Sequence, residues 1–184
     1  MKTVTLDFSK VDSGPHKSFI ERAVSLGYTI IEGYGISNES LAVPTLHDFI
    51  VDKDSSIDSI IKDIPISNQC KKAILAGHFA DDYSEGQLRG GFLSLDKYFK
   101  SKEAIHAINH LAFKENRKFR PGTALEMIQF WKQKRSVCPK FFSSLAKVWK
   151  GIVLGWYGDC AEFEILGFDG EWRPVYKIFI VEDV

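Results

Sequence analysis

Residues 152–181, IVLGWYGDCAEFEILGFDGEWRPVYKIFIV, contain three strand-like runs, over residues 152–157, 161–168 and 172–181. Asp169-Gly170 separates the second run from the third, and Asp-Gly favours a tight hairpin because both central residues of a type I′ turn need positive φ. Pro174 lacks a backbone N–H, which places its end of the last run at a sheet edge or a bulge. This stretch therefore predicts a C-terminal, three-stranded antiparallel meander.

The N-terminal residues repeat the strand signal on both sides of a helical pattern. Residues 3–8 alternate as a strand does, residues 28–32 form a second strand-like run, and a helix is expected to begin near Pro15 and to end at Leu26. Gly27 is well placed to stop that helix. Strand, helix and strand in this order predict a small parallel βαβ unit.

Apolar residues recur at helical spacing through the middle of the chain. Helices are predicted over approximately residues 38–50, 56–63, 68–78, 95–116, 123–135 and 139–150, with the glycine-rich residues 85–91 as a flexible connection. A helical middle between strands at both ends predicts an α+β fold. A chain of 184 residues with 45% hydrophobic content can bury one sizeable core, so a single domain over residues 1–184 is expected.

Composition also limits the compartment and the cofactors that we expect. The N-terminus lacks the apolar segment of a signal peptide and no run of 18 apolar residues occurs, which favours a soluble, cytoplasmic protein without a membrane partner. Three widely spaced cysteines, Cys70, Cys138 and Cys160, fit neither a disulfide framework nor a zinc ribbon. No cofactor is predicted, and the oligomeric state is left open.

The formal net charge is zero, yet acidic and basic residues are sorted along the chain. Residues 1–86 carry a net charge of −5, residues 87–150 carry +10, and residues 151–184 carry −5. Such sorting indicates either a basic face for an acidic partner or basic elements packed against acidic neighbours of the same chain. The candidate binding residues are the cations of the middle segment: Arg89, Lys114, Arg117, Lys118, Arg120, Lys132, Lys134 and Arg135.

Two binding functions suit this basic segment. Cations interleaved with aromatic residues are typical of single-stranded nucleic-acid binding, but the acidic ends of the chain would repel phosphate. We therefore expect a non-enzymatic binding protein of the inhibitor, immunity or adaptor type, whose partner is an acidic macromolecule and a protein rather than a nucleic acid. Nucleic-acid binding by the basic helices of residues 114–150 is the alternative.

A small enzyme is the third class, and Cys138 is its candidate nucleophile. Pro139 is expected to begin a helix, which would leave the thiol at the helix N-terminus beside Lys134, Arg135 and Lys140. Nearby cations and a helix N-terminus lower the pKa of a thiol and favour the reactive thiolate.

The other enzymatic candidate is a metal site on the predicted helix over residues 95–116. Glu103, His106 and His110 are spaced i, i+3 and i+7, so all three project from one helical face. Two imidazoles and a carboxylate are a known ligand set for zinc or non-haem iron. A solvated polar face is the competing interpretation.

Overall fold

The computed structural model describes residues 2–7, 28–33, 41–52, 56–79, 86–146, 152–158, 161–167 and 169–183. The chain divides into two compact units, Met1–Ser40 and Leu41–Val184, and each is described by itself. The expectation of one domain over residues 1–184 stays a prediction. Among the described helices, none is long and apolar enough to cross a membrane.

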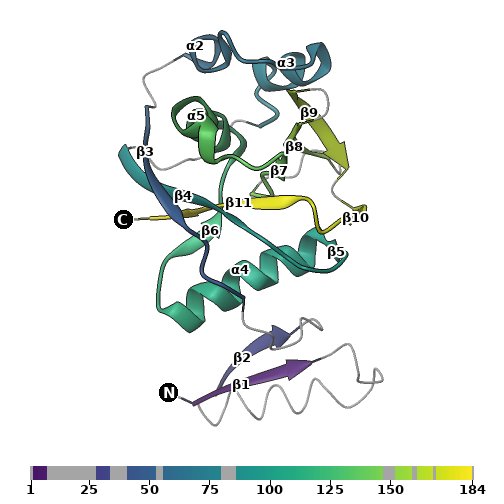
Figure 1. Cartoon of the computed structure of the whole chain (residues 1–184). Coiled ribbons are helices and arrows are strands. Elements are labelled where there is room, and N and C mark those ends of the chain that lie inside the picture. Colours follow the sequence, from purple (N-terminus) through teal and green to yellow (C-terminus); the bar gives the residue numbers. More distant parts are fainter. Residues whose placement is uncertain are drawn as a thin grey trace. The chain divides into compact units, whose positions relative to one another are not determined.

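The first unit contains a parallel pair of strands. β1 (Lys2–Asp7) pairs with β2 (Tyr28–Gly33), from Lys2 opposite Tyr28 to Asp7 opposite Gly33 (Figure 1). Both predicted strands and their parallel pairing are therefore confirmed. The helix expected between them lies outside the described residues.

The second unit is built on a mixed seven-stranded sheet, in the order β3-β4-β11-β7-β8-β9 with β6 also paired to β11. The strands are β3 (Leu46–Val51), β4 (Gly86–Leu93), β6 (Phe119–Pro121), β7 (Phe141–Ser143), β8 (Ile152–Tyr157), β9 (Glu162–Gly167) and β11 (Lys177–Glu182). β11 runs antiparallel to β4 and β6 and parallel to β7. Two short strands, β5 (Phe99–Lys100) and β10 (Glu171–Trp172), form a separate antiparallel pair.

Helices lie on both sides of this sheet, with α4 on one side and α5, α2 and α3 on the other (Figure 1). The helices are α2 (Ile57–Ile61), α3 (Asn68–Leu75), α4 (Ser101–Glu115) and α5 (Ala124–Lys134), followed by the 3₁₀ turn η2 (Arg135–Val137). α5 begins with a reciprocal capping box, in which Thr123 Oγ1 accepts from Glu126 N–H and the Glu126 carboxylate accepts from Thr123 N–H. Such boxes satisfy N–H groups that the first helical turn leaves unpaired.

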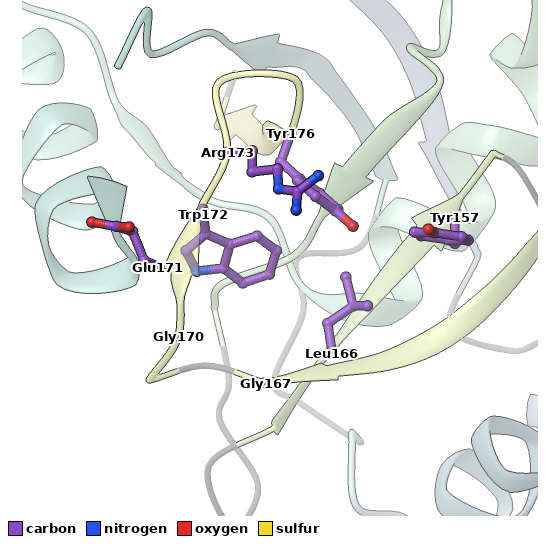
Figure 2. A pocket seen from close by; sticks show the side chains of 8 residues that line it. All are labelled: Tyr157, Leu166, Gly167, Gly170, Glu171, Trp172, Arg173 and Tyr176. Atoms are coloured by element: carbon purple, nitrogen blue, oxygen red, sulfur yellow. The ribbon is translucent and has the colours of Figure 1, made fainter. Parts of the chain in front are cut away.

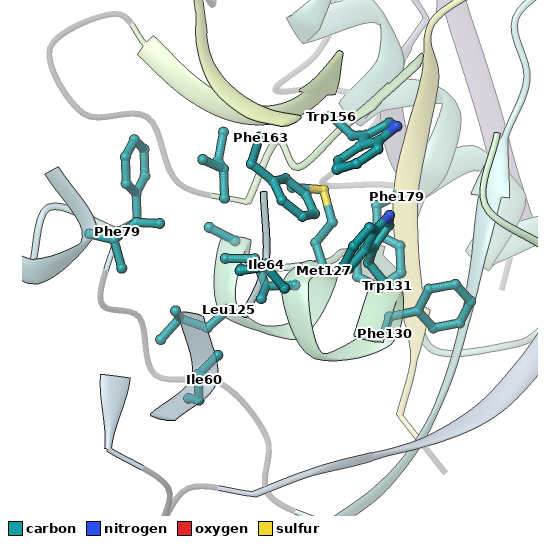
Figure 3. Packing of buried hydrophobic residues seen from close by; sticks show 14 of the residues in the cluster. Ile60, Ile64, Phe79, Leu125, Met127, Phe130, Trp131, Trp156, Phe163 and Phe179 are labelled. Carbon is teal, nitrogen blue, oxygen red and sulfur yellow. The ribbon is translucent and has the colours of Figure 1, made fainter. Parts of the chain in front are cut away.

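A cluster of aromatic rings fills the space between α5 and the sheet (Figure 3). The ring of Phe179, on the central strand, lies 5.2 Å from that of Phe130 on α5, 5.7 Å from Phe92 and 6.2 Å from Phe49, centroid to centroid. Trp131 of α5 packs in the same way on Trp156 of β8, at 4.9 Å. Tilted and edge-on rings at these separations are the favoured arrangements, so the cluster fixes α5 to the sheet.

The α+β class is confirmed, whereas the three-stranded meander is wrong. β8 and β9 are antiparallel neighbours as predicted, but β10 pairs with β5, and β11 lies in the middle of the sheet. Gly170 does not have the positive φ that the expected type I′ turn requires, and the strand after it pairs with β5 rather than with β9. Ile178, Phe179, Ile180 and Val181 are all completely buried, and a strand that is apolar on both faces belongs inside a sheet.

Three segments in the middle of the chain were predicted with the wrong structure. Within the described residues, β3 (46–51) and β7 (141–143) form where helices were expected over 38–50 and 139–150, and β4 (86–93) forms where a flexible connection was expected over 85–91. In β4 the adjacent glycines Gly90 and Gly91 mark close approach: a Cβ on Gly90 would lie 2.7 Å from the Phe130 ring, and one on Gly91 would lie 2.6 Å from Thr45 O. A glycine inside a strand often has this role.

Candidate functional site

Two of the predicted binding residues, Arg89 and Arg117, both bind Glu182 at the end of β11. Arg89 Nη1 lies 2.9 Å and Arg117 Nη2 lies 2.6 Å from Glu182 Oε2, and Arg117 Nε donates to the other carboxylate oxygen. The Arg117 guanidinium also covers the Phe119 ring at 4.6 Å. Hydrogen bonds from Arg117 hold the pKa of Glu182 below its usual range, so this acid stays ionised and binds both cations.

Arg120 is held by two further acids. Its Nη1 and Nη2 atoms donate to both carboxylate oxygens of Glu126, at 2.9 and 2.8 Å, and its Nε lies 3.1 Å from Asp183 Oδ1. The Glu126 side chain is completely buried. The three arginines thus agree with the second explanation of the charge sorting, in which basic residues pack against acidic residues of the same chain.

The remaining predicted cations are dispersed. Lys132 donates to the carbonyls of Ser59 and Ile60 at the end of α2, at 3.3 and 3.2 Å, and Arg135 lies over the Trp131 ring at 4.9 Å. Lys114 lies 3.7 Å from its neighbour Glu115. Lys118 is exposed and Lys134 is half-buried. A binding role for these residues stays a prediction.

Cys138 does not lie at a helix N-terminus, because η2 precedes it and β7 follows shortly after. Its Sγ atom is 3.5 Å from Lys134 O, and burial raises the pKa of the thiol to about 12. The prediction that Cys138 lies at the N-terminus of a helix, which was the basis for a reactive thiolate, is therefore wrong. Cys70 is also a free thiol and is buried in the core, where burial raises its pKa to about 12 as well.

Cys138 is accordingly expected to resist alkylation in the folded protein. With a pKa of about 12, the thiolate fraction at pH 8 should make its reaction with iodoacetamide more than about a hundredfold slower than that of glutathione. Site-resolved mass spectrometry of timed samples measures the rate, and the same protein in urea is the control that should react freely. A rate equal to that of glutathione in the native protein would contradict the burial argument.

The three predicted metal ligands are not arranged as a site. Glu103 uses its Oε2 atom to accept a hydrogen bond from Lys100 N–H at 2.7 Å, which caps α4. His106 and His110 are half-buried on the same helix. In the part of the chain that the structure describes, no group of three histidine, cysteine or acidic side chains is placed to hold a metal ion.

A different site stands out at the junction of β8, β9, β10 and the turn that leads into β11. It is an open cleft of about 370 Å³, hereafter the aromatic cleft (Figure 2). Its lining residues are Tyr157, Leu166, Gly167, Gly170, Glu171, Trp172, Arg173 and Tyr176. A Tyr176 N–H to Arg173 O hydrogen bond of 3.0 Å closes the turn that contains Pro174.

The aromatic walls of the cleft are fixed by their own contacts. Trp172 stacks on Phe99 at 6.4 Å, meets Tyr176 edge-on at 5.3 Å, and donates its indole N–H to Ser101 Oγ at 2.7 Å. On the other side, Phe141 contacts both Tyr157 and Tyr176, at 5.3 and 5.5 Å. Contacts within the chain therefore hold these rings in place.

The charged side chains of the cleft point in different directions. In Figure 2 the Arg173 guanidinium is drawn next to the Tyr176 side chain, whereas Glu171 lies on the opposite side of Trp172. Arg173 is exposed, and its guanidinium makes no hydrogen bond or ion pair with any residue that the structure describes. The cleft thus presents an available cation among aromatic rings.

The sequence pattern did not identify these residues, because no local motif links Tyr157 and Leu166 to Trp172. The signal that could have found them is the run Trp172-Arg173-Pro174, where a proline interrupts a strand between two aromatic residues. The other wall comes from β8 and β9, and only the folded chain brings it there. No family model, curated protein or solved structure matches this chain, so its function has to be inferred from its own residues.

Proposed function

We propose that the chain is a non-enzymatic binding protein of the inhibitor, immunity or adaptor type, that its partner is another protein, and that the aromatic cleft contacts this partner. The observation that carries the proposal is the composition of the cleft. Tyrosine, tryptophan and arginine are the residue types most enriched among interface hot spots, and Tyr157, Trp172, Arg173 and Tyr176 line one cleft here. Rings that are already ordered lose little conformational entropy on binding.

The distribution of charge favours a protein over a nucleic acid. Arg89, Arg117 and Arg120 already bind carboxylates of the same chain, which weakens their attraction for phosphate. A polyanion needs free cations to bind, whereas a protein surface of mixed charge does not depend on them in the same way. A cytoplasmic location, where free thiols stay reduced, belongs to the same proposal.

Site-specific cross-linking tests the proposal. A photoreactive benzoyl-phenylalanine placed at Tyr157, at the mouth of the cleft, is expected to trap one protein in cells that express the chain. The matched control carries the same group at Phe113, which is 56% exposed on α4, and should not trap that protein. The trapped protein, purified and titrated by calorimetry, should bind the wild-type chain at least about tenfold more tightly than Tyr157→Ala.

Two outcomes would contradict the proposal. One is a partner that binds Tyr157→Ala as tightly as it binds the wild-type chain. The other is a cross-link to nucleic acid instead of protein. Thermal melts of both variants show that a loss of binding does not come from unfolding.

One contact favours nucleic-acid binding as the second candidate. Lys140 Nζ lies 5.2 Å above the Phe141 ring, next to Tyr157 and Tyr176, and cations beside rings are what single strands bind. A salt titration against single- and double-stranded oligonucleotides separates the candidates. If the partner is a protein, oligonucleotides should not bind, or their affinity should not change with salt. Oligonucleotide binding that weakens steeply with salt, and that Phe141→Ala abolishes, would favour nucleic acid as the partner.

A further inference from the structure

We infer that the aromatic cleft binds a segment of the protein partner in which a single carboxylate side chain lies next to an aromatic or large apolar side chain. This inference rests on the proposed function and names the chemistry that the cleft would recognise.

The carboxylate follows from Arg173. Its guanidinium lines the cleft without a hydrogen bond or ion pair to any described residue, and Glu171, the other charged lining residue, is directed away from the space between Trp172 and Tyr157 (Figure 2). A guanidinium presents parallel N–H donors that match the two oxygens of a carboxylate. An acidic side chain is therefore the natural partner for this position.

The neighbouring apolar side chain follows from the walls. Trp172, Tyr157 and Leu166 surround the space beside Arg173 (Figure 2), and Val175, in the turn between Arg173 and Tyr176, is 49% exposed. An aromatic or branched side chain inserted there would exchange water for contacts with rings that are already in place. The volume of about 370 Å³ is at the small end of the range for ligand pockets, which suits one or two side chains.

The acids of β9 restrict the segment to few negative charges. Glu162 lies opposite Tyr157 in the antiparallel ladder, and alternation along β9 puts Glu164 and Leu166 on that same face of the sheet. Both glutamates are half-buried. Their charges would repel a run of acidic residues or a nucleic acid, while one carboxylate at Arg173 is compatible with them.

A random peptide library displayed on phage, selected against the immobilised full chain, provides the probe. Enriched peptides are expected to carry an aspartate or glutamate directly beside an aromatic or large aliphatic residue. Their affinities for the wild-type chain, Arg173→Ala, Arg173→Lys, Tyr157→Ala and the matched surface control Phe113→Ala are then measured by fluorescence polarisation. Melting curves establish that each variant is folded.

Arg173→Ala is expected to weaken the best peptide at least about tenfold, Arg173→Lys to weaken it less, and Phe113→Ala to leave it unchanged. Changing the peptide's carboxylate to an amide should weaken its binding to the wild-type chain by the same factor as Arg173→Ala does. The amide peptide should bind Arg173→Ala no more weakly than the acidic peptide does, because both changes remove the same interaction. Peptides that lack an acidic residue, or that bind Arg173→Ala normally, would overturn the inference, as would a library that yields no binder.

These outcomes also separate the inference from the proposed function. If Tyr157→Ala weakens a peptide that Arg173→Ala does not, the cleft is still a protein-binding site and only the carboxylate chemistry is wrong. If neither variant affects any enriched peptide, the cleft is not the contact surface and the proposed function fails with the inference.

Discussion

Arg120→Ala is expected to lower the free energy of unfolding by about 3 kcal/mol or more, as removal of one partner from a buried ion pair does. Arg120 donates to both oxygens of Glu126, whose side chain is completely buried, and it also binds Asp183. In its absence the Glu126 carboxylate keeps only the N–H of Thr123 among the partners described above. Urea denaturation followed by tryptophan fluorescence measures the loss.

Lys118→Ala is the matched control, because Lys118 is exposed two residues away; it should change stability by no more than about 0.5 kcal/mol. The double variant Arg120→Ala/Glu126→Gln should be more stable than Arg120→Ala alone, since it no longer buries an unpaired charge. A loss below about 1 kcal/mol for Arg120→Ala would show that water replaces the guanidinium and that the Arg120–Glu126 pair contributes little to stability.

Phe179→Ala is expected to cost about 3 to 5 kcal/mol of stability, the usual range for a fully buried phenylalanine. The ring is completely buried on the central strand and contacts the rings of Phe49, Phe92 and Phe130. Its removal opens a cavity between α5 and the sheet that these neighbours can close only in part. Urea denaturation gives the free-energy difference.

Phe113→Ala makes the same chemical change at a position that is 56% exposed on α4, so its effect should stay within about 0.5 kcal/mol. Equal losses for the two variants would mean that Phe179 does not occupy the core described here. A large loss for Phe179→Ala alone supports the placement of β11 at the centre of the sheet.

Local patterns in the sequence predicted those elements whose signals are local. Apolar residues at helical spacing over 123–135 predicted α5, and the strand-like runs over residues 152–157 and 161–168 predicted β8 and β9. Pairing between distant segments was not predictable in the same way. The apolar run within residues 177–182 indicates burial on both faces, but nothing within it specifies that β4 and β7 are among its neighbours.

The glycines and charges show the same limit. In the sequence, Gly90 and Gly91 indicate a loop. Only the structure shows that the Phe130 ring and the Thr45 carbonyl lie against them, which explains two glycines inside a strand. Charge sorting correctly raised the possibility of pairing within the chain, yet it did not specify that Glu182 joins Arg89 and Arg117. The aromatic cleft was not predicted because its lining residues, 157, 166–167 and 170–176, come together only when β8, β9 and β10 have folded.

The central position of β11 also affects how the protein is made. β4 pairs along one edge of β11 and β6 and β7 pair along the other, although translation produces β11 after all three. While the ribosome synthesises the intervening residues, the inner edges of β4 and β7 have no strand between them, and unpaired edges of this kind attract other chains. The sheet therefore stays incomplete until its last strand has been synthesised.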